Sequence, residues 1–378
     1  MKNASTSSSV NGVGAGTGKA GLQAGRSAGT LAGGSAAPGG ASGKAAALAG
    51  NAAAKGTAKT GFWLVVLGAA LWGVDPLFRV ILLKSLTSAQ IVLIEHIIIA
   101  LVAVPVLWKN RSELKGLGWR HAGALLFISW GGSAIATILF TMALSSGDLN
   151  AVLLLQKMQP LFAILLAGLL LKEKLPRHFF GLLAVALAGT YLLTFGFTVP
   201  IGHWSDFVQI GSLLSLGAAA LWGGSTVMGR LMVGKMKYET VTSLRFILAL
   251  PLLLAIAWNE GAGWNLPAGG WQIAAVSLNM LGQALLPGLL SLLVYYKGLT
   301  TTKASVATLA ELSFPMVGVL VNWVAFQQMI TTAQVCGFVL IWAALFIISR
   351  QGGSPAAETK AGNSGNPGNA GKVGKAGA

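Results

Sequence analysis

The sequence predicts an all-α integral membrane protein whose ten transmembrane helices form two inverted five-helix repeats. Three observations predict this fold. Hydrophobic residues make up 54% of the chain and charged residues 10%, whereas soluble domains are about one quarter charged. Ten apolar runs are each long enough to cross about 30 Å of hydrocarbon. Finally, the two halves of the chain share sequence patterns at a nearly constant offset.

Two tails flank the apolar region. Residues 1–60 are mostly Gly, Ala, Ser, Thr and Asn with six Lys or Arg, and residues 351–378 have a similar composition. Such segments bury too little apolar surface to offset chain entropy, so we expect both tails to be disordered. The only cysteine, Cys336, excludes an intrachain disulfide, and we expect it to be buried.

The apolar runs between the tails are continuous rather than ten-residue alternations, which predicts helices and not a barrel. They lie near residues 62–83, 90–108, 121–143, 150–171, 178–197, 208–231, 239–258, 271–296, 304–326 and 331–349.

Basic residues alternate between the loops. The loop after the second run holds Lys109, Arg111, Lys115 and Arg120, whereas the next loop, "SSGD", holds none. This alternation continues almost strictly to Arg350. The positive-inside rule then predicts that both termini are cytoplasmic, in agreement with an even number of helices.

An internal repeat is visible in the sequence. "GAALWG" at 68–73 returns as "GAAALWG" at 217–223, with Ala70 matching Ala220 at an offset of 150. Further on, Pro160 matches Pro315 at an offset of 155. We therefore expect a first repeat over 61–199 and a second over 207–350. Each repeat has an odd number of helices, so the second is inverted, as in many transporters with a midplane site.

These motifs resemble the drug/metabolite transporter superfamily, of the ten-helix EamA-like type. The resemblance rests on "ALWG" in both repeats, on "ALSSGDLNAVLLLQKMQPLFAILLAGLLLKEKL" and on "KGLTTTKASVATLAELSFPMVGVLVNWVAFQQM", and it covers about residues 60–350. Glu173 keeps the family's acidic residue before Lys-Leu, whereas "QQMI" at 327–330 departs from it. The resemblance implies transport, usually export, of small metabolites such as amino acids across the bacterial inner membrane.

Ionisable residues inside the runs are candidate site residues, because each costs about 2.5–3.5 kcal/mol at a helix centre. We expect Arg79 and Arg230, near helix ends, to extend to the headgroups. The other candidates for substrate or coupling, with two glutamines, are Asp75, Glu95, His96, Gln156, Lys157, Arg245, Gln283 and Glu311.

Depth along the helices predicts two ion pairs, Glu95 with Lys157 and Arg245 with Glu311. These pairs either lock the bundle or serve transport, by gating, by binding a zwitterion or by carrying a proton. Asp75 is either a proton or amine acceptor or a carboxylate bonded to backbone at a helix break. His96 is either pH-sensitive or packed and neutral.

Prolines and tryptophans complete the set of candidates. Pro160, Pro287 and Pro315 each free a carbonyl four residues back, at Gln156, Gln283 and Glu311, which makes either a hinge or a static kink. Trp72, Trp130 and Trp222 lie well inside the runs and either line a cavity or simply pack.

The function predicted is a secondary transporter of a small polar or amphipathic metabolite such as an amino acid, working by alternating access. Two alternatives are an efflux carrier for cationic or aromatic drugs and a non-transporting scaffold or receptor. No nucleophile–base set or metal motif is visible, so we expect neither an enzyme nor a cofactor or metal. The expected partners are the bilayer, a small-molecule substrate and, in one interpretation, protons. We expect no nucleic acid partner, and either a monomer or a homodimer.

Overall fold

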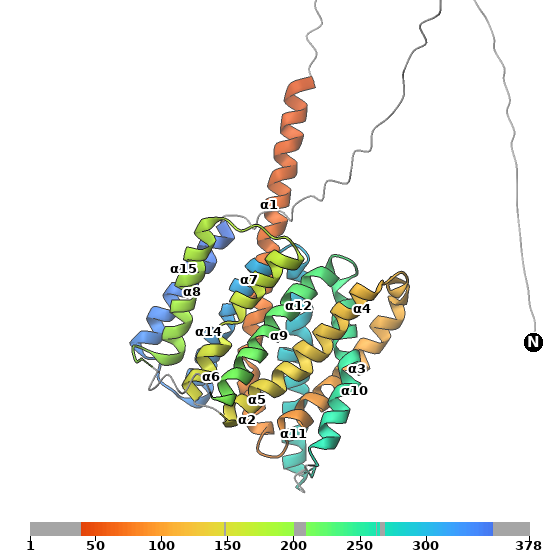
Figure 1. Cartoon of the computed structure of the whole chain (residues 1–378), viewed down its shortest axis with the longest axis vertical. Helices are drawn as coiled ribbons and strands as arrows, with labels where there is room; N and C mark the ends of the chain where they lie inside the picture. The colour runs from red at the N-terminus through yellow and green to blue at the C-terminus, as the bar shows by residue number, and fades with distance from the viewer. Residues whose placement is uncertain (1–38, 147–148, 200–208, 262, 265–268, 351–378) are drawn as a thin grey trace, which may run out of the picture. The chain divides into compact units, whose positions relative to one another are not determined.

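A computed structural model describes residues 39–146, 149–199, 209–261, 263–264 and 269–350 (Figure 1). The chain divides into two units, Met1–Ala47 and Leu48–Ala378, and every site described below lies in the second. The described residues contain helices and no strand, and ten segments are long and apolar enough to cross a membrane. The prediction of an all-α integral membrane protein with ten spans is therefore confirmed.

We number these segments as spans 1 to 10. They are Gly56–Arg79, Ser88–Lys109, Trp119–Ala143, Ala151–Leu170, Arg177–Phe195, Ile210–Val233, Tyr238–Asn259, Gly270–Leu299, Ala304–Ala325 and Thr332–Arg350.

Several spans consist of more than one helical element. In the first half the elements are α1 (Gly39–Trp72), α2 (Asp75–Leu82), α3 (Ser88–Lys109), the 3₁₀ turn η1 (Arg111–Leu114), α4 (Trp119–Leu126), η2 (Phe127–Ile135), α5 (Ala136–Ser146), α6 (Leu149–Gln156), α7 (Gln159–Leu170) and α8 (Arg177–Phe195). In the second half they are α9 (Ile210–Val233), α10 (Tyr238–Asn259), α11 (Gly270–Gln283), η4 (Ala284–Leu290), α12 (Ser291–Leu299), α13 (Ala304–Ala310), η5 (Glu311–Ser313), α14 (Phe314–Phe326) and α15 (Thr332–Arg350).

The start of α1 corrects the predicted extent of the first tail. Helix α1 begins at Gly39, so residues 39–60 are helical and not disordered. Alanine and lysine, which dominate "GKAAALAGNAAAK", are among the best helix formers, so local propensity favours a helix in a segment whose composition predicts disorder. The rest of the predicted tails, 1–38 and 351–378, lies outside the described residues.

Each proline proposed as a hinge coincides with a departure from α-helical geometry. Helix α6 ends before Pro160, and the amides of Lys157 and Met158 bond to carbonyls three residues back. Before Pro315 the chain forms a 3₁₀ turn at Glu311–Ser313. Pro287 lies inside a π-helical stretch, Ala284–Leu290. Spans 4, 8 and 9 are therefore all irregular near their middles.

Spans 3 and 8 share a π-helical segment at matching positions. An offset of 155 places Ala284–Leu290 of span 8 against residues 129–135, inside the π-helix Phe127–Ile135 of span 3. The sequences differ locally, since span 3 has Gly131 and Gly132 there and span 8 has Pro287. π-helical turns are rare and occur often at functional sites. Their presence at equivalent positions of both halves indicates that a functional site lies at this depth of the bundle.

Close glycine contacts show how the two halves interlock. A β-carbon on Gly73 of span 1 would lie 2.4 Å from the Phe314 carbonyl of span 9. A β-carbon on Gly223 of span 6 would lie 2.8 Å from the Gln159 carbonyl of span 4. Gly223 is Gly73 plus 150, and Phe314 is Gln159 plus 155. The same contact therefore occurs twice with the halves exchanged, as an approximate two-fold relation requires.

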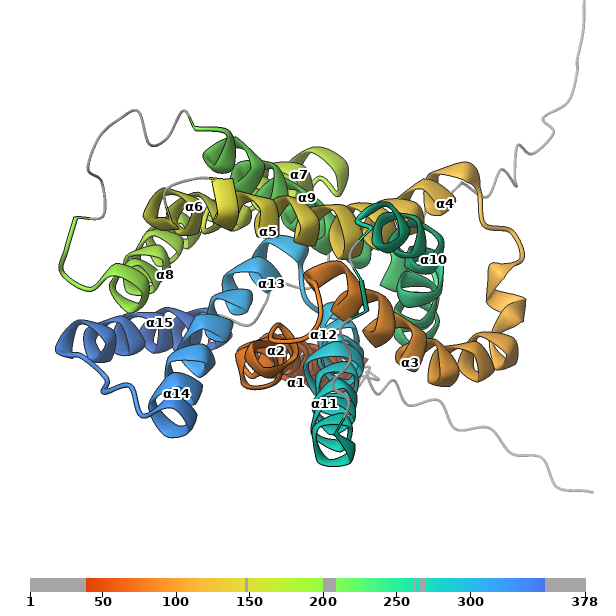
Figure 2. The ribbon, with the colours of Figure 1, turned by 90° about the horizontal axis from the view of Figure 1, so that it is seen from below.

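Two pairs of equivalent spans pack against each other at opposite flanks. Helices α8 and α15 lie side by side, as do α3 and α10 (Figure 2). Between α8 and α15 the backbones meet at glycines, where a β-carbon on Gly337 would lie 2.6 Å from the Gly189 carbonyl. Cys336 lies on another face of α15 and is exposed, so its predicted burial is wrong. Successive helix positions point about 100° apart, and Gly337 takes the packed face.

Candidate functional site

A buried carboxylate, Glu311, lies where three other spans meet it. Its Oε1 accepts hydrogen bonds from the Tyr295 hydroxyl (2.5 Å) and the Thr226 hydroxyl (2.9 Å), and its Oε2 accepts one from the Gln159 amide (2.7 Å). The residue is 4% exposed. Burying a charged group is costly unless hydrogen bonds compensate it, and three donors aimed at both oxygens supply that compensation. We call Glu311, Tyr295, Thr226 and Gln159 the Glu311 cluster.

The predicted ion pair between Arg245 and Glu311 does not form. Arg245 instead donates to Ser133 (2.9 Å), Ser225 (3.2 Å) and Tyr296 (2.8 Å). The neighbouring tyrosines separate the two charges, because consecutive residues of α12 point about 100° apart. Tyr295 therefore reaches Glu311, and Tyr296 reaches Arg245.

The other predicted pair, Glu95 with Lys157, is also wrong. Arg79 binds Asp75 through two contacts of 2.6 Å, and its Nη2 lies 3.9 Å from Glu95 Oε2. Gln283 donates a further hydrogen bond to Asp75 Oδ1. Arg79 is thus held inside the bundle rather than extended to the headgroups, and Asp75 binds side chains rather than freed backbone. Two carboxylates and one guanidinium form this second group.

Lys157 lies apart from Glu95. Its Nζ is 5.0 Å from the centre of the Phe314 ring on α14. Within the described part of the chain, no carboxylate is within ion-pair distance of it. Arg230, the second arginine expected to extend outward, instead donates to the Thr300 carbonyl at 3.0 Å.

His96 is packed, as one of the two interpretations held. Its Nδ1 lies 2.8 Å from the Val92 carbonyl, and its ring meets the edge of Phe246 at 5.0 Å. Its Nε2 is buried and has no hydrogen-bond partner among the described residues. Gln156, at the end of α6, is also buried.

Two aromatic pairs occupy equivalent places in the two halves. Trp72 and Tyr295 have ring centres 5.1 Å apart, and Trp222 and Phe140 have ring centres 5.4 Å apart. The offsets of 150 and 155 carry Trp72 onto Trp222 and Phe140 onto Tyr295. The Trp222 indole also donates to the Gly132 carbonyl in the π-helical part of span 3. Trp130 takes a different place, since it is half-exposed and donates to the Leu248 carbonyl.

The polar groups do not follow the two-fold relation. Gln156 is the counterpart of Glu311 and Phe140 is the counterpart of Tyr295, so the acceptor charge and its hydroxyl donor exist in one half only. Gly229 is the counterpart of Arg79, and a β-carbon there would lie 2.7 Å from the Tyr296 ring. An aromatic ring therefore fills the space that a second arginine would need.

The sequence predicted the charged residues but missed most of their partners. The predicted site residues did not include Tyr295, Tyr296, Thr226, Gln159 and Ser133, because hydroxyls and amides are common in membrane spans. The repeat alignment does contain one indication of the cluster. It pairs Tyr295 with Phe140 and Glu311 with Gln156, so a hydroxyl and a carboxylate both appear in the second half only.

Three loop carboxylates bind helix N-termini of the opposite half. Glu113 accepts hydrogen bonds from the Lys237 amide and the Thr240 hydroxyl of α10, each 2.9 Å long. Glu173 accepts from the Ala304 amide (2.8 Å) and the Ser305 amide (3.1 Å) of α13, and Glu260 accepts from Thr87 (2.8 Å) at the start of α3. We call Glu113, Glu173 and Glu260 the carboxylate caps. Anionic groups are stabilised at helix N-termini.

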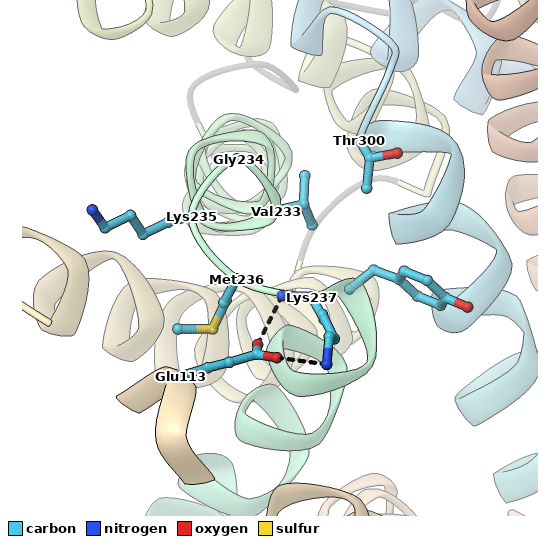
Figure 3. Close-up of a pocket in the computed structure, with 8 residues that line it drawn as sticks. Glu113, Val233, Gly234, Lys235, Met236, Lys237 and Thr300 are labelled. Atoms are coloured by element: carbon cyan, nitrogen blue, oxygen red, sulfur yellow. Dashed lines mark hydrogen bonds and ion pairs between the residues drawn. The ribbon is translucent and has the colours of Figure 1, made fainter. Parts of the chain in front are cut away.

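Glu113 also borders a crevice of about 500 Å³ at the end of the bundle where the basic loops lie. Figure 3 shows its carboxylate directed at Lys237, whose Nζ is 3.2 Å away. Partial burial acts to raise the pKa of Glu113, but hydrogen bonds from the Lys237 amide, the Thr240 hydroxyl and the Lys237 ammonium outweigh it. The pKa therefore lies below its ordinary value.

Comparison with known proteins matches this chain to membrane transporters. The model of the EamA-like transporter family matches this chain twice, over residues 59–195 and 209–350. The chain is 33% identical over 299 residues to a riboflavin transporter of Fusobacterium nucleatum, covering 77% of this chain and 97% of that protein. An uncharacterized transporter of Bacillus subtilis is 25% identical over 75% of this chain and 92% of its own length.

Two further matches carry less weight, one because it is shorter and one because its identity is low. A riboflavin transporter of Brucella anthropi is 27% identical over 47% of this chain and 59% of its own length. A solved structure, described only as a crystal structure of a protein, superposes with a TM-score of 0.63 over 77% of this chain and 98% of its own. At 18% identity, that structure supports the fold alone.

Proposed function

The chain belongs to the EamA-like transporter family, and from this premise we propose that it carries riboflavin or a similar flat, polar heterocycle across the membrane by alternating access. Its relatives are named transporters, so a small-molecule substrate and an embedded position in the bilayer follow directly. The substrate itself is proposed from the 33% identity to a riboflavin transporter along nearly its whole length.

The Glu311 cluster is the observation that supports a heterocyclic substrate. It joins acceptor and donor groups to both aromatic pairs, because the Tyr295 ring packs at a tilt against Trp72 and Thr226 lies one turn from Trp222. A flavin ring offers a flat face to aromatic side chains and an edge of alternating donors and acceptors to carboxylate, amide and hydroxyl groups. Sites for small molecules combine apolar walls with a few such polar groups.

Movement of the substrate requires helices that can bend. We propose that the irregular segments at Pro160, Pro287 and Pro315 act as hinges around the Glu311 cluster. Glu311 is the group we propose for proton coupling, with substrate exchange as the alternative driving force. We also propose that the direction of transport is export, that the protein lies in the bacterial inner membrane and that both termini are cytoplasmic. The basic loops support the orientation, and reporter fusions to each terminus test it.

Counterflow in proteoliposomes tests the carrier and its substrate. Vesicles loaded with unlabelled riboflavin should accumulate labelled riboflavin transiently, and Glu311→Gln should reduce the initial rate at least about tenfold by weakening the cluster. Glu239→Gln, the same change in the first turn of α10, is the matched control. Absence of saturable counterflow, or a normal rate for Glu311→Gln, would contradict the proposal. Loading riboflavin inside or outside the vesicles in separate experiments reports the preferred direction of transport.

An amino acid is the second candidate substrate, and one observation favours it. Tyr295 and Tyr296, adjacent on α12, contact groups of opposite charge, Glu311 and Arg245. A zwitterion that displaced the tyrosine hydroxyls would find a carboxylate and a guanidinium to pair with. Counterflow of labelled amino acids without flux of riboflavin would select this candidate.

A further inference from the structure

A second cavity, of about 420 Å³, lies beside the break in span 4. Its walls come from span 4 and α8 and are mostly apolar, formed by Leu154, Met158, Leu187 and Leu192. Two of its lining residues, Lys157 and Tyr191, carry polar groups. The Tyr191 hydroxyl already donates to the Thr198 carbonyl at 2.6 Å. Lys157 is therefore the one basic residue in the lining of an otherwise apolar cavity.

The ammonium of Lys157 lies deep in the span. It sits 5.0 Å from the Phe314 ring, and Phe314 is the eleventh residue of span 9, which has 22 residues. A lysine that extended to the headgroups would lie near an end of the neighbouring span. Lys157 instead holds its charge near the middle of the bilayer, where ionisable groups are costly and usually functional.

The fold does not require this lysine. The offset of 155 places Leu312 at the equivalent position of span 9, where an apolar side chain packs at 4% exposure. Both copies have the proline three residues later and the helix break. The lysine therefore adds a charge to one half, and among the described residues no carboxylate neutralises it.

We infer that this cavity, which we call the Lys157 cavity, binds a small apolar carboxylate, with the carboxylate at Lys157 and the apolar body against Leu154, Leu187 and Leu192. The volume lies within the range of small-molecule pockets, about 300–1,000 Å³. A phospholipid fits the charge poorly, because its phosphate lies at the interface, roughly 15 Å from the midplane. The inference is independent of riboflavin transport, because it rests on a different cavity.

Fluorescence titration of the purified full-length protein in phosphatidylcholine nanodiscs tests this site. The probe is dansyl-undecanoic acid, and its methyl ester is the neutral control. We expect the acid to bind saturably and the ester to bind at least about tenfold more weakly. Lys157→Met should lower the affinity of the protein for the acid by about ten- to a hundredfold. Lys157→Arg keeps the charge and should bind within a few-fold of the unmodified protein.

A second pair of variants keeps the test independent of the charge change. Ala188→Phe fills the cavity and should abolish binding, whereas Ala255→Phe, at an exposed position of α10 that does not line the cavity, should not. Size-exclusion profiles and melting curves establish that each variant is folded. Equal binding of acid and ester, or unchanged binding by both Lys157→Met and Ala188→Phe, would overturn the inference. Competition by phosphatidylglycerol at the potency of the free acid would replace it with a lipid site.

Discussion

At the residue scale, the buried charges are stabilised mainly by neutral side chains. Glu311 has three neutral donors, and Arg245 has three hydroxyl acceptors. Only Arg79 pairs with carboxylates among the described spans. Hydroxyls and amides hold a charge while remaining exchangeable with a ligand's own polar groups. A direct ion pair would have to be broken first at greater cost.

Tyr295→Phe isolates one hydrogen bond of the Glu311 cluster. Phe140 shows that phenylalanine fits the equivalent packing against Trp222, so the change removes the hydroxyl and little else. A hydrogen bond to a charged group contributes about 1.5–3 kcal/mol. We therefore expect a lower melting temperature and a slower riboflavin counterflow. Tyr191→Phe, which removes an exposed hydroxyl from α8, is the matched control, and equal effects of the two changes would contradict the role of Tyr295.

Glu113 gives a prediction about pH. Its pKa is lower in the folded protein than in the unfolded chain, so its contribution is fully present above the unfolded pKa. The contribution is lost as the pH falls through the folded pKa. Glu113→Gln should therefore lower the melting temperature at pH 7, and the difference from the unmodified protein should shrink at about pH 4 and below.

Melting curves of both proteins across this pH range measure the effect. Lys115→Gln, an exposed change in the same loop, should give a difference that does not depend on pH in this way. A constant difference between Glu113→Gln and the unmodified protein at all pH values would show that packing, not charge, carries the effect of Glu113.

At the element scale, the sequence predicted the spans well and the side-chain partners poorly. Hydropathy and the repeat determine how many helices there are and how deep each residue lies. Depth placed Glu95 level with Lys157, but a partner also depends on how each helix is rotated about its axis. One residue changes that direction by about 100°. Arg79, one turn from Asp75 on the same helix, was therefore the better partner for both carboxylates.

Gly223→Ala tests the interlocking of the halves. Its β-carbon would lie 2.8 Å from the Gln159 carbonyl and 2.9 Å from the Ala163 amide, and backbone atoms cannot move aside cheaply. We expect a loss of about 1–3 kcal/mol in stability, seen as a lower melting temperature. Gly168→Ala in α7 meets nothing within 4 Å and should instead stabilise by up to about 1 kcal/mol. A neutral result for Gly223→Ala would contradict the close helix contact.

At the scale of the whole molecule, the carboxylate caps join the two halves unequally at the two ends. Glu113 and Glu173 both lie at the end with the basic loops, and each binds a helix of the second half. Gln328 stands at the repeat position of Glu173, so the opposite end has glutamine there and has Glu260 as its cap. The basic end therefore has more carboxylate contacts between the halves, and the alternating access that we propose would have to release them.

A reversible cross-link at the basic end tests whether this release is needed for transport. Lys303 Nζ lies 3.4 Å from the Lys174 carbonyl, so these residues of opposite halves are close. In a Cys336→Ser background, Lys174→Cys with Lys303→Cys should react with a short disulfide-forming cross-linker and lose riboflavin counterflow. A reductant should restore it. Each single cysteine variant should keep its activity after the same treatment. Full transport by the cross-linked protein would mean that the two halves need not separate at this end.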